Sequence, residues 1–173
     1  MGREGIKEMN KADIIAVINA IFNGNASQAI EHFVADGGDI NAIIPEGGRP
    51  ILHQCCECMD FEAIRTCARL GADLNLPDEH GHRPLHIATD IDIDSVLQAN
   101  RGEVTYETVK LLISLGADPN LTDARGEKPR ETVKAYGGII FGDRNALAFD
   151  AIVASVLPNP GQSISDRSNT SES

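Results

Sequence analysis

Apolar residues recur at helical spacing in three separate segments of the chain. Within each segment they mostly fall three or four residues apart, which places them on one face of an α-helix. These positions are Ala26, Ala29, Ile30, Phe33 and Val34, then Phe61, Ile64, Cys67 and Ala68, and finally Tyr106, Val109, Leu112 and Ile113. The apolar stretch at residues 12–22 predicts a further helix before them, and residues 145–157 predict a closing helix. The pattern is that of an all-α protein.

A common phrase follows each of the three amphipathic segments. The phrase is Gly-x-Asp-x-Asn, and it begins at Gly37, Gly71 and Gly116. A glycine at the end of a helix readily adopts the left-handed conformation that terminates it. Aspartate and asparagine then favour a turn, because their short polar side chains bond to the nearby backbone. We therefore expect each helix to stop at its glycine and to lead into a turn.

A second phrase, in which a proline closely follows a glycine, opens the next helical pattern at residues 48–53, 81–86 and 126–131. His53 and His86, which occupy the same place in this phrase, are 33 residues apart. The interval is 45 residues both from Asn75 to Asn120 and from His86 to Glu131. A single insertion of 12 residues between His86 and Asn120 accounts for both longer intervals. The chain is therefore an internal repeat with one consistent register.

The two phrases together resemble the ankyrin repeat, whose period is about 33 residues and whose signature is Thr-Pro-Leu-His-x-Ala. Pro84-Leu85-His86 carries the signature most clearly. The resemblance implies a short, stand-alone, all-α solenoid of about four helix-turn-helix units with projecting turns. The predicted divisions are a flexible segment at 1–9, an ankyrin-repeat domain at 10–157 with units at about 10–41, 42–75, 76–120 and 121–157, and a disordered tail at 158–173.

The threonine of the signature is absent from every copy. Arg83 and Lys128 stand at this position in two units, and Pro50 or Arg49 stands there in another. An arginine cannot cap a helix as threonine does, and loss of such a cap costs about 0.5–2 kcal/mol. The substitutions also place cationic side chains along the row of turns.

Composition favours a core of small and aliphatic side chains. Aromatic residues make up only 4% of the chain and tryptophan is absent, so we expect no large cofactor pocket and no cofactor. The formal net charge of -11, with no run of Lys and Arg, disfavours nucleic acid and membrane surfaces as partners. The acidity fits either a general effect on solubility or a basic protein partner.

The sequence predicts a cytoplasmic protein that is monomeric on its own. The first apolar stretch is interrupted by Asn19 and lacks the pattern of a signal peptide. No apolar run approaches the length that crosses a bilayer. Cys55, Cys56 and Cys58 lie too close together for an ordinary disulfide framework, so we expect reduced thiols.

The cysteine cluster is the first candidate for chemistry. His53, Cys55, Cys56 and Cys58 fall within six residues, and zinc takes such ligands. In the ankyrin register, however, His53 is the signature histidine, and Cys55 and Cys56 occupy small buried positions where a free cysteine acts as a small hydrophobe. Side chains on one helical turn also point in different directions. We therefore expect no metal ion at this cluster.

The histidine group at His80, His82 and His86 is the second candidate, because its spacing suggests a metal site or a proton shuttle. His86 is the signature histidine of its unit and is expected to be structural. His80 and His82 lie on the turn and are expected to be exposed contact residues. The sequence holds no nucleophile elbow, phosphate-binding loop or dinucleotide motif, so we predict a protein that is not an enzyme.

The insertion, at about residues 91–103, is the most individual feature of the chain. It begins directly after Asp90, which forms an acidic alternation with Asp92 and Asp94. A calcium loop would need a glycine and a glutamate where this sequence has serine and arginine. Two interpretations stay open: a longer connection between helices, or a contact specific to a partner. Under the second, reversing the three acidic charges would weaken binding and leave stability nearly unchanged.

The resemblance implies a protein that binds another protein on a concave surface formed by the turns and the first helices. Two functional classes stay open: an adaptor or docking subunit, and an acidic inhibitor or immunity-type protein that neutralises a partner enzyme or toxin. A metal-binding enzyme would require stoichiometric zinc. The predicted partner-binding residues are Glu46, Arg49, Gln54, Glu57, Asp78, His80, His82, Arg83, Asp90, Asp92, Asp94, Arg125 and Lys128.

Overall fold

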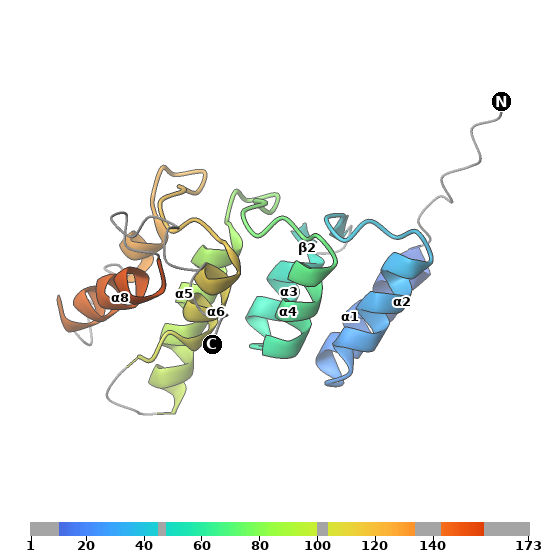
Figure 1. Ribbon diagram of the computed structural model, residues 1–173, viewed down its shortest axis with the longest axis horizontal. Coiled ribbons are helices and arrows are strands. Elements are labelled where there is room, and N and C mark those ends of the chain that lie inside the picture. The colour runs from blue at the N-terminus through green and yellow to red at the C-terminus, as the bar shows by residue number, and fades with distance from the viewer. Residues whose placement is uncertain (1–10, 45–47, 100–103, 134–142, 158–173) are drawn as a thin grey trace, which may run out of the picture.

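The computed structural model describes residues 11–44, 48–99, 104–133 and 143–157, and these form a row of helix pairs (Figure 1). The helices are α1 Lys11–Phe22, α2 Ala26–Ala35, α3 Ile51–Glu57, α4 Phe61–Arg69, α5 Pro84–Gln98, α6 Glu107–Leu115 and α8 Asp143–Val156, with a further helical stretch at 129–133. The predicted all-α solenoid is confirmed. The segments predicted at 1–9 and 158–173 and the candidate residue Glu46 lie outside the described residues.

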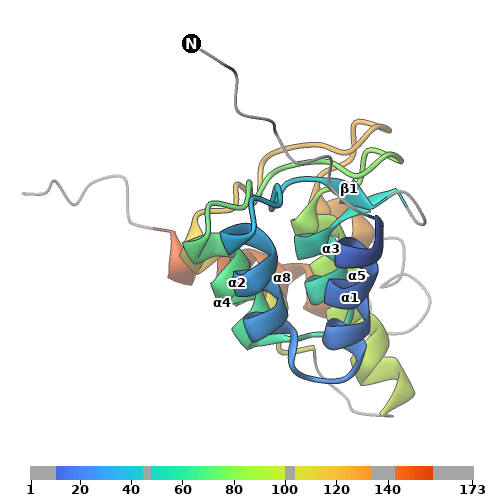
Figure 2. The ribbon, with the colours of Figure 1, turned by 90° about the vertical axis from the view of Figure 1, so that its right-hand side faces the viewer.

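The helices form two layers. The first helices of the units, α1, α3 and α5, pack side by side, and the second helices, α2, α4, α6 and α8, form the other layer. Buried aliphatic residues such as Ile30, Ile64 and Leu112 fill the space between the layers. Figure 2 shows that the turns project over the first layer and give the molecule an L-shaped cross-section. We call the surface formed by the turns and the first helices the inner face.

The repeated glycines end the second helices as predicted. The backbone φ angle is +91° at Gly37, +90° at Gly71 and +114° at Gly116, which is the left-handed region. In each phrase the aspartate Oδ1 then accepts a hydrogen bond from the backbone N–H of the following asparagine, at 2.8–2.9 Å. The three copies therefore share one turn geometry, although their flanking residues differ.

The asparagines of the phrase link consecutive repeats. Asn41 Oδ1 accepts a hydrogen bond from the backbone N–H of Asp73 at 2.7 Å. One repeat further on, Asn75 Oδ1 accepts the equivalent bond from Asp118 at 2.9 Å. Each asparagine thus satisfies a backbone donor of the next turn, which fixes the spacing between neighbouring units.

The projecting turns are short hairpins. In the first one, β1 Ile43–Ile44 pairs antiparallel with β2 Arg49–Pro50. These two-residue strands were not predicted from the sequence, since they are too short to show an alternating pattern. The next turns, at residues 78–82 and 123–127, are each closed by a backbone hydrogen bond of 2.8–2.9 Å between their first and last residues.

Two glycines in these turns offer a matched test of their geometry. Gly81 and Gly126 have φ angles of +83° and +80°, so alanine at either site meets a left-handed penalty of about 1–2 kcal/mol. A Cβ at Gly81 would also lie 2.4 Å from the Cβ of Ala124, whereas the space at Gly126 is open. We expect Gly81→Ala to lower the free energy of unfolding by about 1 kcal/mol more than Gly126→Ala, measured by urea denaturation. Equal losses would contradict this close approach of the two turns.

The insertion is largely helical. It lengthens the first helix of the third unit, so that α5 has 15 residues where α3 has 7. In both views the end of α5 extends beyond the neighbouring helices, on the side away from the turns (Figures 1 and 2). Residues 91–98 therefore lengthen a helix and do not form a loop. Residues 100–103 of the insertion lie outside the described residues.

The last helix is anchored to the third and fourth units. The buried Tyr106 ring packs edge-on against Phe149 of α8, with ring centroids 5.5 Å apart, and its hydroxyl donates to the backbone oxygen of Asn145 at 3.3 Å. Arg130 forms a two-point ion pair with Asp150 at 2.5 and 2.7 Å. These contacts hold α8 on α6, where it closes the second layer.

Candidate functional site

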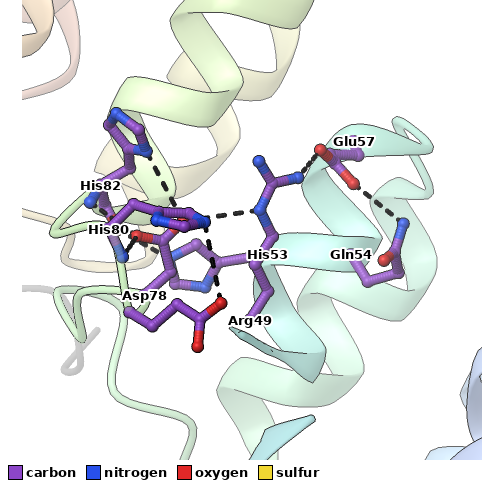
Figure 3. Close-up of polar contacts among 8 residues, drawn as sticks. Arg49, His53, Gln54, Glu57, Asp78, His80 and His82 are labelled. Carbon is purple, nitrogen blue, oxygen red and sulfur yellow. Dashed lines mark hydrogen bonds and ion pairs between the residues drawn. The ribbon is translucent and has the colours of Figure 1, made fainter. Parts of the chain in front are cut away.

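A polar network joins the second and third units on the inner face (Figure 3). Arg49, from the turn of the second unit, contacts the carboxylate of Glu57 on α3, and its Nε lies 3.5 Å from Asp78 Oδ2 on the next turn. Gln54 donates from Nε2 to the other oxygen of Glu57 at 3.0 Å. Arg49 therefore bridges two units, and the structure brings the predicted residues Arg49, Gln54 and Glu57 into contact with one another.

Asp78 has a structural role that the sequence analysis did not assign to it. Its Oδ1 accepts hydrogen bonds from the backbone N–H groups of His80 and His82 at 2.9 and 2.8 Å. The residue is only 5% exposed and its side chain is fully buried. The prediction of Asp78 as a residue in contact with a partner is therefore corrected: the carboxylate shapes the turn and balances Arg49. His80 remains on the surface, beside Glu79 at 3.7 Å.

The signature histidines connect each unit to the next turn. The Nε2 of His53 lies 3.0 Å from the backbone oxygen of His82, and the Nε2 of His86 lies 2.9 Å from that of Glu127. The two bonds span 29 and 41 residues, which differ by the length of the insertion. Both side chains are buried. His86 therefore has a structural role, as predicted, because its ring links the third unit to the fourth turn.

Burial keeps both of these histidines neutral. Loss of hydration lowers the pKa of His53 from 6.5 to about 4 and also lowers the pKa of His86. Because Nε2 faces a carbonyl oxygen, it must carry the proton, so Nδ1 is a hydrogen-bond acceptor. Neither Nδ1 atom has a partner among the described residues.

Arg83 is held within the chain. Its guanidinium donates to the backbone oxygen of Thr122 at 2.8 Å and to that of Asn75 at 2.5 Å. Arg83 stands where the signature has threonine, but it provides no side-chain cap for α5. It links the loops that contain Asn75 and Thr122. Arg83, which was predicted to contact a partner, is half-buried and is held in place by these bonds.

The fourth unit departs from this arrangement. Glu131 stands where the other units have histidine, and its Oε2 accepts from the backbone N–H of Lys128 at 2.9 Å. This bond satisfies the start of the unit's own helix, as in a capping box. Lys128 and Arg125 are exposed on the inner face, where the sequence predicted them.

Asp92 is buried beneath α6. It was predicted to contact a partner, but it is only 5% exposed. Its Oδ2 accepts from the backbone N–H groups of Thr108 and Val109 at 3.0 and 3.1 Å, and its Oδ1 accepts from the Thr108 hydroxyl at 2.7 Å. Residue 106, which precedes α6, has a left-handed backbone and offers no side-chain cap. Asp92 therefore caps α6 from α5, and the prediction is corrected.

Asp90 and Asp94 occupy the opposite side of α5. Both are half-buried, and within the described part of the chain neither forms a hydrogen bond or an ion pair with a cationic side chain. Partial burial, together with the neighbouring charge of Asp90, raises the pKa of Asp94. They present two adjacent carboxylates on the inner face.

A pocket of about 370 Å³ lies between the turns of the third and fourth units. Four predicted residues line it: Arg49, His82, Asp90 and Arg125. Five further lining residues were not among the predicted ones: His86, Ile87, Asp123, Glu127 and Thr132. Asp123 and Glu127 follow Asp78 and His82 by the same 45-residue interval that relates the third and fourth units. The repeat register would therefore have found these two acidic residues.

The cysteines pack as core residues. Cys55, Cys56 and Cys67 are completely buried, with Cys55 Sγ and Cys67 Sγ 4.0 Å apart, and Cys58 is half-buried. Burial raises the pKa of the Cys56 thiol, which keeps it protonated and unreactive. Among the described residues, no group of three or more potential ligands is placed to hold a metal ion. None of the described helices combines the length and apolar character needed to span a membrane.

Comparison with known proteins agrees with this architecture. A family model of ankyrin repeats matches residues 17–123 in three copies. The chain belongs to the ankyrin-repeat family. Ankyrin repeats are generally modules for protein–protein interaction, and the fourth unit at 121–157 lies almost entirely beyond the matched range.

Two curated relatives carry similar repeats within much larger proteins. Human ankyrin repeat and SOCS box protein 16 is 34% identical over 58 residues, which is 34% of this chain and 12% of that protein. The Drosophila melanogaster neurogenic locus Notch protein is 31% identical over 74 residues, which is 43% of this chain and 3% of that protein. The chain therefore matches only a small part of each, and what it shares with them is the ankyrin repeat itself.

Proposed function

We propose that this ankyrin-repeat protein acts as an adaptor or docking subunit that binds a partner protein on its inner face. The observation that carries the proposal is the gathering of unlike polar groups in one place. Arg49, His82 and Arg125 come from three successive turns and Asp90 comes from α5, and all four line the same pocket. Side chains that a rigid scaffold brings to one surface from separate repeats are typical of a recognition site.

A photo-crosslinking experiment tests the choice of face. In one variant a crosslinking amino acid replaces Gln54, which is half-buried on the inner face. In the matched control it replaces Arg65, which is exposed on α4. After irradiation in extract of the native host, a specific protein should be joined to the Gln54 variant and not to the Arg65 variant. Capture from Arg65 alone would place the binding surface on the second layer and overturn the proposal.

A second candidate is an inhibitor or immunity-type protein that neutralises a basic enzyme or toxin. Asp90 and Asp94, which have no cationic partner within the described residues, favour it, together with the net charge of -11. Such complementarity raises the rate of association through long-range attraction that salt screens.

Salt dependence separates the two candidates. For an inhibitor of a basic partner, we expect the association rate with the purified, crosslinked partner to fall about tenfold or more between low and high salt. The rate would be measured by stopped-flow fluorescence or surface plasmon resonance. A nearly constant rate would contradict the inhibitor and favour an adaptor held mainly by apolar contacts.

A further inference from the structure

The pocket between the third and fourth turns is lined by three carboxylates and two guanidiniums. His86, which is only 4% exposed, lines it and has an Nδ1 acceptor without a partner among the described residues. Asp90, Asp123 and Glu127 add carboxylates to the same lining. A buried hydrogen-bond acceptor without a partner lowers stability, because it has lost its hydration and gained no hydrogen bond. A donor that reached it would remove this penalty.

The two arginines of the lining each have acidic neighbours. Arg49 contacts the carboxylates of Glu57 and Asp78, which lie outside the pocket lining. Arg125 attracts Asp123, whose Oδ1 also accepts from the backbone N–H groups of Arg125 and Glu127 at 2.9 Å. Burial opposes ionisation of Asp123, but the Glu127 and Arg125 N–H groups outweigh it and lower its pKa. The carboxylates of Asp90 and Glu127 are left to attract a cation.

The apolar part of the lining suits an alkyl stem. Ile87 on α5 and Thr132 in the following helical stretch contribute methyl groups beside the polar groups. A side chain with a long apolar stem and a charged head can therefore contact both kinds of wall. The volume of about 370 Å³ is at the lower end of the range for ligand sites and suits one such side chain with accompanying water.

We propose that this pocket receives the guanidinium of an arginine side chain presented by the partner protein. A guanidinium carries five donors in a planar fork and no acceptor, so it can meet the carboxylates of Asp90 and Glu127 from different directions. Asp90 is its main charge partner, and Asp94, one helical turn further along α5, extends the attraction. The pocket's affinity for a guanidinium does not depend on the proposed function. Only the source of the arginine, a partner protein bound on the inner face, rests on that function.

Titration with a small probe tests the pocket without the partner. N-acetyl-arginine methylamide is added to the ¹⁵N-labelled protein, and the amide shifts of Ile87, Asp90 and Thr132 are followed. We expect saturable shifts at these residues, none with the uncharged citrulline derivative, and weaker binding of the lysine derivative. Shifts that are absent or that fall elsewhere would overturn the pocket, and equal binding of the lysine derivative would overturn its assignment to a guanidinium.

Two variants sharpen this result. Asp90→Asn removes the pocket charge, and Asp36→Asn removes the same charge from the exposed residue that follows α2. We expect the dissociation constant of the arginine derivative to rise about tenfold for Asp90→Asn and to change less than about twofold for Asp36→Asn. Equal changes would reduce the effect to net charge and overturn the proposal.

The two proposals fail separately. Arginine binding in the pocket, combined with crosslinking from Arg65 alone, would overturn the docking face and retain the pocket. Crosslinking from Gln54, combined with no response to the arginine derivative, would retain the docking face and overturn the pocket.

Discussion

Replacing Asp92 with alanine is expected to lower the free energy of unfolding by about 3 kcal/mol. The change removes the acceptor for the backbone N–H groups of Thr108 and Val109 and for the Thr108 hydroxyl, and leaves these donors buried beneath α5. Burial of the carboxylate offsets part of its benefit, since loss of hydration raises the pKa of Asp92 despite these bonds. The loss arises mainly because the donors cannot reach water once their acceptor is gone.

Urea denaturation followed by circular dichroism measures this effect, with Asp94→Ala as the matched control. Asp94 is on the same helix, two residues away, but it is half-buried and makes no hydrogen bond among the described residues. Its removal should change stability by less than about 0.5 kcal/mol. Similar losses for the two variants would contradict the role of Asp92 as the cap of α6.

Acidification should destabilise the protein through His53. Its pKa is 6.5 when unfolded and about 4 when buried, so the unfolded state takes up a proton first as the pH falls. Above pH 6.5 both states are neutral and no penalty arises. Between pH 6.5 and 4 the free energy of unfolding should decrease, in total by about 3 kcal/mol from this residue alone. His86, whose pKa burial also lowers, acts in the same direction.

The variant His53→Gln isolates this contribution, because a glutamine amide can donate to the backbone oxygen of His82 and does not titrate. Across this pH interval its stability should fall less steeply than that of the original protein, by up to about 1.4 kcal/mol per pH unit. Proton NMR of the ring should also find His53 neutral at pH 5.5. A ring that titrates near pH 6.5 would contradict the burial argument.

The repeat register was predictable because the residues that define it act locally. A glycine with positive φ and an aspartate that bonds two residues onward carry their geometry in their own chemistry. The three Gly-x-Asp-x-Asn turns therefore formed as expected, with the same bond of 2.8–2.9 Å in each. The helices were also predictable, because the spacing of apolar residues indicates which face of each helix is buried.

The role of Asp92 was missed for a tertiary reason. An alternation of acidic residues looks alike in a loop and on a helix, but on a helix Asp90 and Asp94 share one face and Asp92 lies on the other. Thr89 and Val96 lie on that second face and are buried. The position of Asp92 was therefore available from the sequence, but its value as a cap depends on where α6 begins beside it.

The bonds of Arg83 left no trace in the sequence at all. Its acceptors are the backbone oxygens of Asn75 and Thr122, and any residue carries such an oxygen. Only the stacking of the loops brings them within reach of the guanidinium. The pocket was likewise found only in part, because its lining combines three turns with two helical segments that lie far apart in the sequence.

The direction of the histidine bonds bears on how such a chain can grow during evolution. His53 and His86 each reach toward the unit that follows, whereas Glu131 bonds back to the start of its own helix. Duplication of the third unit inside the gene would supply a new histidine together with a new acceptor. A unit added after the fourth would meet no such donor from Glu131. The solenoid is therefore easier to lengthen from within than beyond its fourth unit.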